Sequence, residues 1–206
     1  MYHSWSVYLL AFSSDISRHR RLHAWIQLKL YDMSNNNTKT LGEAPWLHVV
    51  ISTCLGTGLL PGAPGTYAGF LGLLVWLGLW AILPSHLSLL IATVLLLVCT
   101  TLIGIWTTNV MERYWGEDPR AVVIDEPLGT WMACLGVCYF DGPFWQVTVL
   151  ATLGFLFFRI IDIKKPLGCR WVDNNVHGGW GCMADDLLAG FYAMILTLIV
   201  RFLLFQ

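Results

Sequence analysis

Residues 171–190 read WVDNNVHGGWGCMADDLLAG, and this stretch decides how the rest of the chain has to be arranged. It places Asp173, His177 and the adjacent pair Asp185 and Asp186 directly ahead of a strongly apolar tail. A charged carboxylate at the centre of a bilayer costs about 2.5–3.5 kcal/mol on insertion scales, so an uncompensated one at the mouth of a membrane helix is expensive. The remaining sequence is therefore expected to bring compensating groups to this place.

The composition is that of a protein embedded in a membrane. Of the 206 residues, 56% are hydrophobic and 12% are charged, whereas roughly a quarter of residues are charged in soluble domains. The mean hydropathy is +0.62, and the 11 Trp and 10 Phe fit the aromatic belts of membrane interfaces. With a net charge of −1 and no basic stretch interleaved with aromatic residues, nucleic acid is not an expected partner. The sequence predicts an all-α, polytopic membrane bundle.

Residues 1–45 differ in character from the apolar segments that follow. Basic residues in 18–29 alternate with Leu, Trp and Ile, which fits a basic amphipathic helix on anionic headgroups, and equally a poorly ordered tail. Residues 36–38 match a glycosylation sequon, a short pattern that is common by chance. We therefore treat 1–45 as a basic extension and 46–206 as the membrane domain.

Five apolar stretches are expected to span the membrane. They cover residues 66–83, 87–108, 121–140, 144–161 and 186–205. Because a helix needs about 20 apolar residues to cross a bilayer, the shorter run 46–55 is expected only to half-enter it or to pack inside the bundle. The loop 56–66, GTGLLPGAPGT, follows this run, and its prolines and glycines exclude a helix there.

Counting the crossings places three polar stretches on one membrane face. The loop 56–66 precedes the first span, and each further pair of crossings returns the chain to that face, at 109–126 and at 159–186. The turns of the opposite face, 84–86 and 141–143, contain no Lys or Arg. The shared face carries several basic residues: Arg113, Arg120, Lys164, Lys165 and Arg170. By the positive-inside rule that face is expected to be cytoplasmic, although Arg201 near the far end of the last span runs mildly against this.

Five carboxylates fall at the expected cytoplasmic ends of the spans: Asp125, Glu126, Asp162, Asp185 and Asp186. Converging acids cannot all stay ionised without cations, because like charges raise one another's pKa. Hard oxygen ligands in a cluster suit Mg²⁺, which keeps several waters and commonly bridges to a phosphate. Plainer alternatives remain, since Asp185 or Asp186 could cap a helix. Asp162 could simply pair with Arg159 or Lys165 at i,i+3. The expected position of all five carboxylates at the same membrane face favours the metal site.

The loop 56–66 has two readings. It lacks the Gly-Lys-Ser/Thr ending of a nucleotide P-loop, so ATP is not implied. Its backbone N–H groups could form an anion nest that holds phosphate oxygens, or the loop could be only a hinge between a half-helix and a span. Under the first reading the phosphate-holding residues are Gly56, Thr57, Gly58, Gly65 and Thr66.

The polar segment before the last span supplies further candidates. Lys164, Lys165 and Arg170 could bind a phosphate group, or could simply face lipid headgroups. His177, flanked by Val176 and Gly178, could donate a proton to a leaving oxygen, or could be only a solvated loop residue.

Four blocks of the chain also match a known pattern in order: GTGLLPGAPGTYAG (56–69), VVIDEPLGTW (122–131), FFRIIDIKKPLGCRWVD (157–173) and NNVHGGWGCMADDLLAG (174–190). At these residues the chain resembles the phosphatidylglycerophosphatase A family, bacterial membrane phosphatases of glycerophospholipid synthesis. The resemblance covers about residues 46–205. It implies Mg²⁺-dependent removal of the terminal phosphate of phosphatidylglycerophosphate to give phosphatidylglycerol, in a multi-pass protein of the bacterial cytoplasmic membrane.

The resemblance also assigns residues to motifs. It implies that Asp125 and Glu126 form the acidic pair of the second block. The third block contributes Arg159, Asp162, Lys165 and Pro166, and the fourth contributes the acidic pair Asp185 and Asp186. The chain departs from the family at Gly168, where a second proline is common, which affects the local loop geometry more than the chemistry.

The leading hypothesis is a Mg²⁺-dependent lipid phosphate monoesterase, with the five acids as ligands and catalytic groups. Arg159 and Lys165 would offset charge on the phosphoryl oxygens, His177 would serve as proton donor, and a covalent aspartyl-phosphate is a variant. A small transporter or ion pathway is the rival, but it predicts acids spread through the bilayer depth. A structural subunit of a lipid-synthesis complex is a third reading, and the oligomeric state stays open.

Overall fold

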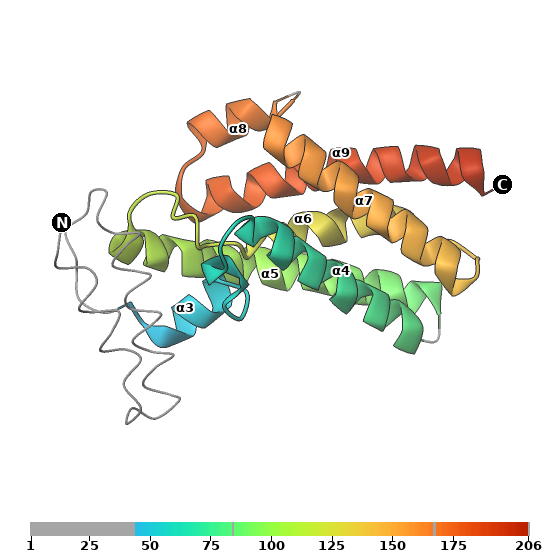
Figure 1. The fold of residues 1–206 in the computed structure, drawn as a ribbon, viewed down its shortest axis with the longest axis horizontal. Helices are drawn as coiled ribbons and strands as arrows, with labels where there is room; N and C mark the ends of the chain where they lie inside the picture. The colour runs from blue at the N-terminus through green and yellow to red at the C-terminus, as the bar shows by residue number, and fades with distance from the viewer. Residues whose placement is uncertain (1–43, 84, 167, 206) are drawn as a thin grey trace.

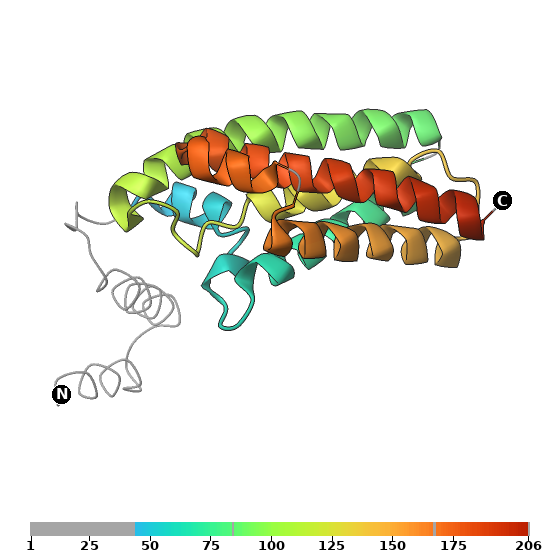
Figure 2. The same ribbon diagram turned by 90° about the horizontal axis from the view of Figure 1, so that it is seen from above.

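The computed structural model describes residues 44–83, 85–166 and 168–205, and every regular element within them is helical. The elements are α3 (Trp46–Ser52), η1 (Thr57–Leu59), α4 (Pro64–Ile82), α5 (His86–Trp115), α6 (Asp125–Cys134), η2 (Leu135–Val137), α7 (Phe144–Lys164), α8 (Cys169–Asn175) and α9 (Gly178–Leu204). The long helices lie side by side in an elongated bundle (Figures 1 and 2). The all-α prediction is confirmed. The amphipathic-helix, disordered-tail and sequon readings of the extension fall on residues 1–43, outside the described residues.

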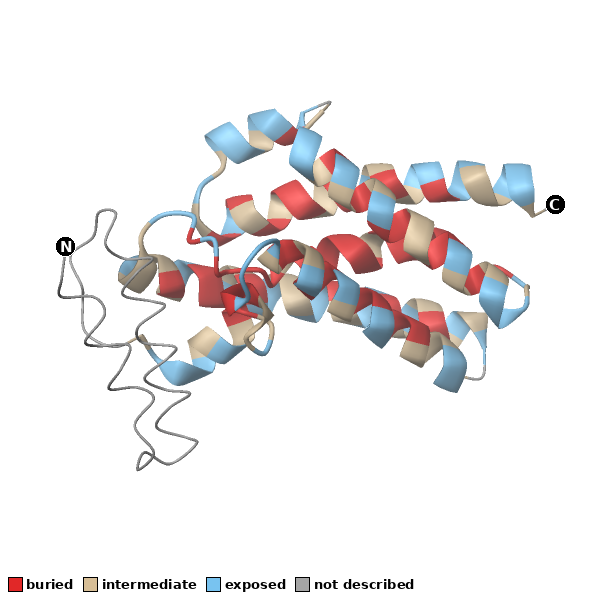
Figure 3. Ribbon diagram, viewed as in Figure 1, coloured by how far each residue is buried: buried red, intermediate tan, exposed pale blue. Residues whose placement is uncertain are grey.

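Four helices in the described part of the chain, α4, α5, α7 and α9, are long and apolar enough to cross a membrane. The expected third span, 121–140, is instead the 10-residue α6 followed by η2. Most residues of α6 are buried among the other helices, as Figure 3 shows. The prediction of about five spans is therefore corrected, among the described residues, to four helices long and apolar enough to span a membrane and one short interior helix. An interior helix faces protein rather than lipid, so bilayer thickness does not set its length.

The short helix still carries the chain from one end of the bundle to the other. Asp125 begins α6 at the end where α5 and α7 finish. Asp141, which follows η2, lies at the opposite end, where its Oδ1 is 2.6 Å from Nε2 of His86 at the start of α5. The starts of α4, α6 and α9 and the ends of α5 and α7 therefore share one end of the bundle (Figure 1), which we call the acidic end.

Two helices reach further into this end than their hydropathy predicts. α5 begins after a capping box between Ser85 and Ser88 and continues to Trp115, beyond the expected end at residue 108. α9 begins at Gly178 rather than at residue 186, with His177 as its N-cap. Asp185 and Asp186 consequently lie inside α9, and the alternative that one of them caps this helix is wrong.

The position of α9 is set by glycines that allow close helix packing. A Cβ atom at Gly190 of α9 would lie 2.5 Å from the carbonyl oxygen of Gly129 in α6. A Cβ atom at Gly154 of α7 would lie 3.0 Å from Oγ1 of Thr197 in α9. Small residues let membrane helices approach this closely. The contact at Gly190 holds the preceding turn of α9, which carries Asp185 and Asp186, beside the start of α6.

Candidate active site

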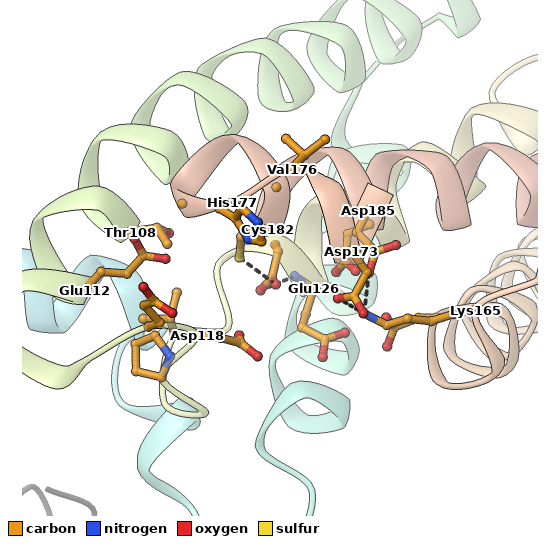
Figure 4. A pocket seen from close by; sticks show the side chains of 18 residues that line it. Thr108, Glu112, Asp118, Glu126, Lys165, Asp173, Val176, His177, Cys182 and Asp185 are labelled. Atoms are coloured by element: carbon orange, nitrogen blue, oxygen red, sulfur yellow. Dashed lines mark hydrogen bonds and ion pairs between the residues drawn. The ribbon is translucent and has the colours of Figure 1, made fainter. Parts of the chain in front are cut away.

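A pocket of about 280 Å³ opens at the acidic end of the bundle (Figure 4). Its walls come from the end of α5, the segment 117–122, the start of α6, the end of α7 and residues 173–186. The predicted carboxylates line it together with two other predicted side chains: Asp125, Glu126, Asp162, Asp185, Asp186, Lys165 and His177. Residues from 109–126 and 159–186, two of the three stretches predicted to share a membrane face, therefore line one pocket, whereas none from 56–66 does.

Asp162, Asp185 and Asp186 form the tightest group of acids in the pocket. One oxygen from each of the three carboxylates lies within 4.8 Å of the others. Asp185 and Asp186 are only 6% and 4% exposed. Oδ1 of Asp185 and Oδ2 of Asp186 are buried without a hydrogen-bond partner among the described residues. Buried carboxylate oxygens without partners are energetically costly, and a bound cation would compensate them. This group therefore has the oxygen ligands expected of a site for a hard divalent cation.

Arg159 of α7 links two of the predicted acids. Its Nη1 donates to Oε2 of Glu126 in α6 and to Oδ2 of Asp162, the latter at 2.8 Å. The i,i+3 pair of Arg159 with Asp162 is therefore present, and Asp162 also belongs to the three-carboxylate group. Glu126 is a partner of Arg159, whereas Asp162 stands between this arginine and the two aspartates of α9.

Lys165 ties the end of α7 to α8 and α9. Its Nζ lies 2.5 Å from Oδ1 of Asp173 and 2.6 Å from Oδ2 of Asp185. Burial alone would lower the pKa of Lys165, but the hydrogen bonds and negative charges of the two aspartates outweigh it and raise the pKa above its usual value. Lys165 is therefore a fixed positive charge at the edge of the carboxylate group. Lys164 and Arg170 are exposed and do not line the pocket.

Asp125 is held by two donors at the first turn of α6. The backbone N–H of Glu126 donates to its Oδ1 at 3.1 Å. The thiol of Cys182, one turn before Asp186 on α9, donates to its Oδ2 at 3.0 Å. His177 is exposed at the start of the same helix and lines the pocket, as Figure 4 shows.

The loop 56–66 does not bring the predicted phosphate-holding residues into the pocket. The N–H groups of Gly56 and Gly58 donate to Thr53 within a tight turn, and the hydroxyl of Thr57 donates to the carbonyl oxygen of Thr53 at 3.0 Å. These donors are therefore already used. Gly65 and Thr66 lie in the first turn of α4, where Gly65 faces Glu126 so closely that a Cβ atom would overlap its carboxylate. The hinge reading describes this turn.

Several pocket residues were not predicted from the sequence: Asp173, Cys182, Thr108, Glu112, Glu117 and Asp118. Asp173 lies in the stretch 171–190, and its position eight residues after Lys165 was the available signal. The expected span in this region ends at residue 108, four residues before Glu112, whereas α5 continues to Trp115. Nothing in the sequence indicated that Cys182 would face Asp125.

Comparisons with known proteins identify the family of this chain. The family model described as Phosphatidylglycerophosphatase A matches residues 50–201. A Bacteroides thetaiotaomicron protein named "Putative phosphatidylinositol-3-phosphatase" is 43% identical over 77% of this chain and 96% of its own length. Proteins named Phosphatidylglycerophosphatase A from Escherichia coli and Haemophilus influenzae are 35% and 29% identical, over 71% and 82% of this chain and 77% and 96% of their own lengths. No solved structure is a significant match. The chain therefore belongs to the phosphatidylglycerophosphatase A family and is a phosphatase.

Proposed function

We propose that this protein removes the terminal phosphate of phosphatidylglycerophosphate to give phosphatidylglycerol, and that the reaction requires Mg²⁺. The family match and the names of two relatives support this substrate. The proposal of a metal ion rests on the group Asp162, Asp185 and Asp186, in which one oxygen of each carboxylate lies within 4.8 Å of the others. Two of these oxygens are buried and without partners among the described residues.

Different residues at this site have different roles in the hydrolysis. Asp162, Asp185 and Asp186 would hold the ion, and Asp125 lies beside them. When bound, Mg²⁺ polarises the phosphoryl group and lowers the pKa of a coordinated water. Lys165 lines the pocket and would offset negative charge on the phosphoryl oxygens, whereas Arg159 does not line it and would act through its ion pairs with Glu126 and Asp162. The raised pKa of Lys165 keeps that side chain positively charged at neutral pH.

His177 has the position of a proton donor to the leaving alcohol. It caps the start of α9 and lines the same pocket as the carboxylates. Its exposure leaves it free to exchange protons with water. A leaving alkoxide needs a proton, and a histidine imidazole within reach of the leaving oxygen can donate one.

The location of the pocket suits a lipid whose tails stay in the membrane. All of its carboxylates lie at one end of a bundle whose outer surface is apolar, and a volume of about 280 Å³ fits a headgroup rather than acyl chains. Arg113, Arg120 and Arg170 are exposed near this end. By the positive-inside rule the acidic end faces the cytoplasm, with the protein in the bacterial cytoplasmic membrane.

A second substrate is favoured by one specific observation. The relative with 43% identity is named as a phosphatidylinositol-3-phosphatase, and it matches over 96% of its own length. Both substrates are phosphate monoesters on a polyol attached to a lipid, so the same carboxylate group would serve either. The difference between them lies in the polyol.

The proposal is tested by phosphate release from purified full-length protein in detergent micelles. Phosphatidylglycerophosphate and phosphatidylinositol 3-phosphate are supplied separately, with Mg²⁺ or with EDTA. We expect phosphate release from phosphatidylglycerophosphate with Mg²⁺ and none with EDTA. Equal release with EDTA would refute the metal requirement. A higher kcat/KM for phosphatidylinositol 3-phosphate than for phosphatidylglycerophosphate would show that the inositol lipid is the preferred substrate.

The transporter alternative is tested with the same preparation. Reconstituted into vesicles, a transporter would move an ion or solute without releasing phosphate from lipid. The carboxylates gather at one end of the bundle rather than along its length, which argues against a pathway. Flux without phosphate release would favour the transporter over the hydrolase.

A further inference from the structure

The pocket has a second polar wall that the proposed hydrolysis does not use. Thr108 and Glu112 on α5, with Asp118 in the following loop, line one side of it. Lys165, Asp173 and Asp185 line the other side, and Figure 4 shows the two sets facing each other across the opening. The first set consists only of groups that can accept hydrogen bonds from a ligand.

Thr108 is the unsatisfied member of this wall. It is 2% exposed, and its hydroxyl has no hydrogen-bond partner among the described residues. Buried hydroxyl groups in folded proteins nearly always have a partner. Thr108 lies one helical turn before Glu112, so the two side chains share a face of α5 and line the same pocket. A ligand with a hydroxyl group at this wall would satisfy both.

Glu112 is held in place by the packing of α5 against the start of α9. Oδ1 of the neighbouring Asn109 accepts a hydrogen bond of 2.7 Å from the N–H of Gly179. Gly178 adopts a φ of 69°. A Cβ atom there would lie 2.9 Å from Oδ1 of Asn109 and 3.7 Å from Oε2 of Glu112. The glycine therefore lets the end of α5, with Glu112, lie directly against the first turn of α9.

The chemistry of this wall selects its ligand. Within the described residues, the acids close enough together to hold a metal ion are Asp162, Asp185 and Asp186, and Glu112 is not among them. An anionic ligand would be repelled by the carboxylates of Glu112, Glu117 and Asp118. Neutral hydroxyl groups donate hydrogen bonds to carboxylates and bring no charge, so a polyol fits this wall.

We propose that Thr108 and Glu112 form a subsite for a hydroxyl group of the polyol that carries the phosphate. This inference rests on the proposed function, because it assumes that the phosphate lies at the opposite wall. The glycerol unit of phosphatidylglycerophosphate has one free hydroxyl, and an inositol ring has several. The acceptors on α5 therefore determine which headgroup is preferred, whereas the carboxylates of α7 and α9 act on the phosphate that all such lipids share.

The test compares phosphatidylglycerophosphate with an analogue that lacks the free glycerol hydroxyl but keeps the terminal phosphate. The quantity measured is the ratio of kcat/KM for the two lipids, with Mg²⁺, in wild type, Glu112→Gln and Thr108→Val. A hydrogen bond from a neutral hydroxyl to a charged acceptor corresponds to roughly a tenfold preference or more. We expect wild type to prefer the natural lipid by about that factor. We expect the preference to fall toward one in Glu112→Gln and to fall in Thr108→Val.

Matched controls come from the same fold. Thr101 is also on α5, but its hydroxyl donates to the carbonyl oxygen of Leu97 at 2.7 Å, so Thr101→Val controls for the loss of a hydroxyl from this helix. Asp141→Asn removes a carboxylate from the opposite end of the bundle. Both should keep the wild-type ratio. An unchanged ratio in Glu112→Gln and Thr108→Val, or an equal loss on both lipids, overturns the subsite.

Binding of the product separates the subsite from the hydrolysis. Short-chain phosphatidylglycerol keeps the headgroup hydroxyls, so it should raise the thermal midpoint of wild type more than its analogue without those hydroxyls does. This difference should shrink in Glu112→Gln. If wild type released no phosphate yet kept the difference, the proposed function would fail while the subsite stood. If wild type hydrolysed the lipid but bound both products alike, the subsite alone would fail.

Discussion

Arg159 of α7 is ion-paired with Glu126 at the start of α6, and the two side chains are only 14% and 12% exposed. The residues are 33 positions apart in the chain. Since Arg159 also contacts Asp162 at 2.8 Å, this one arginine links the start of α6 to the carboxylate group.

Replacing Arg159 with Met should destabilise the protein and abolish hydrolysis. Breaking a buried ion pair typically costs about 3–5 kcal/mol because the remaining charge is left without a partner. The double variant Glu126→Gln with Arg159→Met should recover part of that stability but no activity, since the positive charge stays absent. Denaturant unfolding in micelles and phosphate release measure the two effects. A double variant less stable than either single variant would contradict the pairing.

Gly65→Ala should impair the site, whereas Gly78→Ala on the same helix should not. A Cβ atom at Gly65 would overlap the carboxylate of Glu126, and one at Gly78 has nothing within 4 Å. In a helix, Ala is otherwise favoured over Gly by about 1 kcal/mol. We therefore expect Gly65→Ala to lose activity and thermal stability. We expect Gly78→Ala to keep its activity and to be at least as thermally stable as wild type. Equal behaviour of the two variants would show that Gly65 is not a contact point for Glu126.

Gly168 is required by its backbone conformation, and proline should fail there. It adopts a φ of 94° as the N-cap of α8, whereas proline is restricted to a φ near −65°. The departure from the family pattern thus accompanies a local turn that only glycine adopts easily. Gly168→Pro should disturb α8 and the contact of Asp173 with Lys165, and so reduce kcat. Gly168→Ala should be milder, at about 1–2 kcal/mol. Full activity of Gly168→Pro would refute this account of the turn.

The convergence of the acids could be predicted from the sequence because it depends on topology. Once the apolar segments are counted, Asp125, Asp162 and Asp186 have to lie at the same end, whatever the details of packing. Boundaries were harder to predict. The apolar pattern of α5 fades near residue 108 while the helix runs on to Trp115. Polar residues there face a pocket rather than lipid, and for this reason the expected span stops short of Glu112.

Side-chain contacts between different helices could not be predicted from the sequence. The i,i+3 contact of Arg159 with Asp162 follows from helical spacing, but its contact with Glu126 depends on how α6 and α7 are rotated about their axes. The hypothesis that 56–66 binds phosphate required free backbone N–H groups. The N–H groups of Gly56 and Gly58 instead donate to Thr53 within their own turn, which the sequence does not show. A glycine-rich stretch offers free N–H groups only when its fold leaves them unpaired.

Cys182→Ala should lower kcat more than Cys182→Ser. The thiol donates to Oδ2 of Asp125 at 3.0 Å and so orients that carboxylate from α9. Serine keeps a donor on the same helix position, although its shorter bond weakens the contact, whereas alanine removes the donor. We expect kcat to fall in the order wild type, Ser, Ala, with little change in KM for the lipid. If both variants lost only thermal stability, and lost it equally, the thiol would not position Asp125.

The central claim is that Asp162, Asp185 and Asp186 hold a divalent ion that hydrolysis requires. The most direct measurement is phosphate release from phosphatidylglycerophosphate over a range of Mg²⁺ concentrations, in wild type, Asp186→Asn and the distant control Asp141→Asn. The account predicts that Asp141→Asn follows the wild-type Mg²⁺ curve, while folded Asp186→Asn loses about 10²–10³-fold in kcat and needs more Mg²⁺ for its remaining activity. Wild-type turnover by Asp186→Asn with an unchanged Mg²⁺ requirement would contradict it.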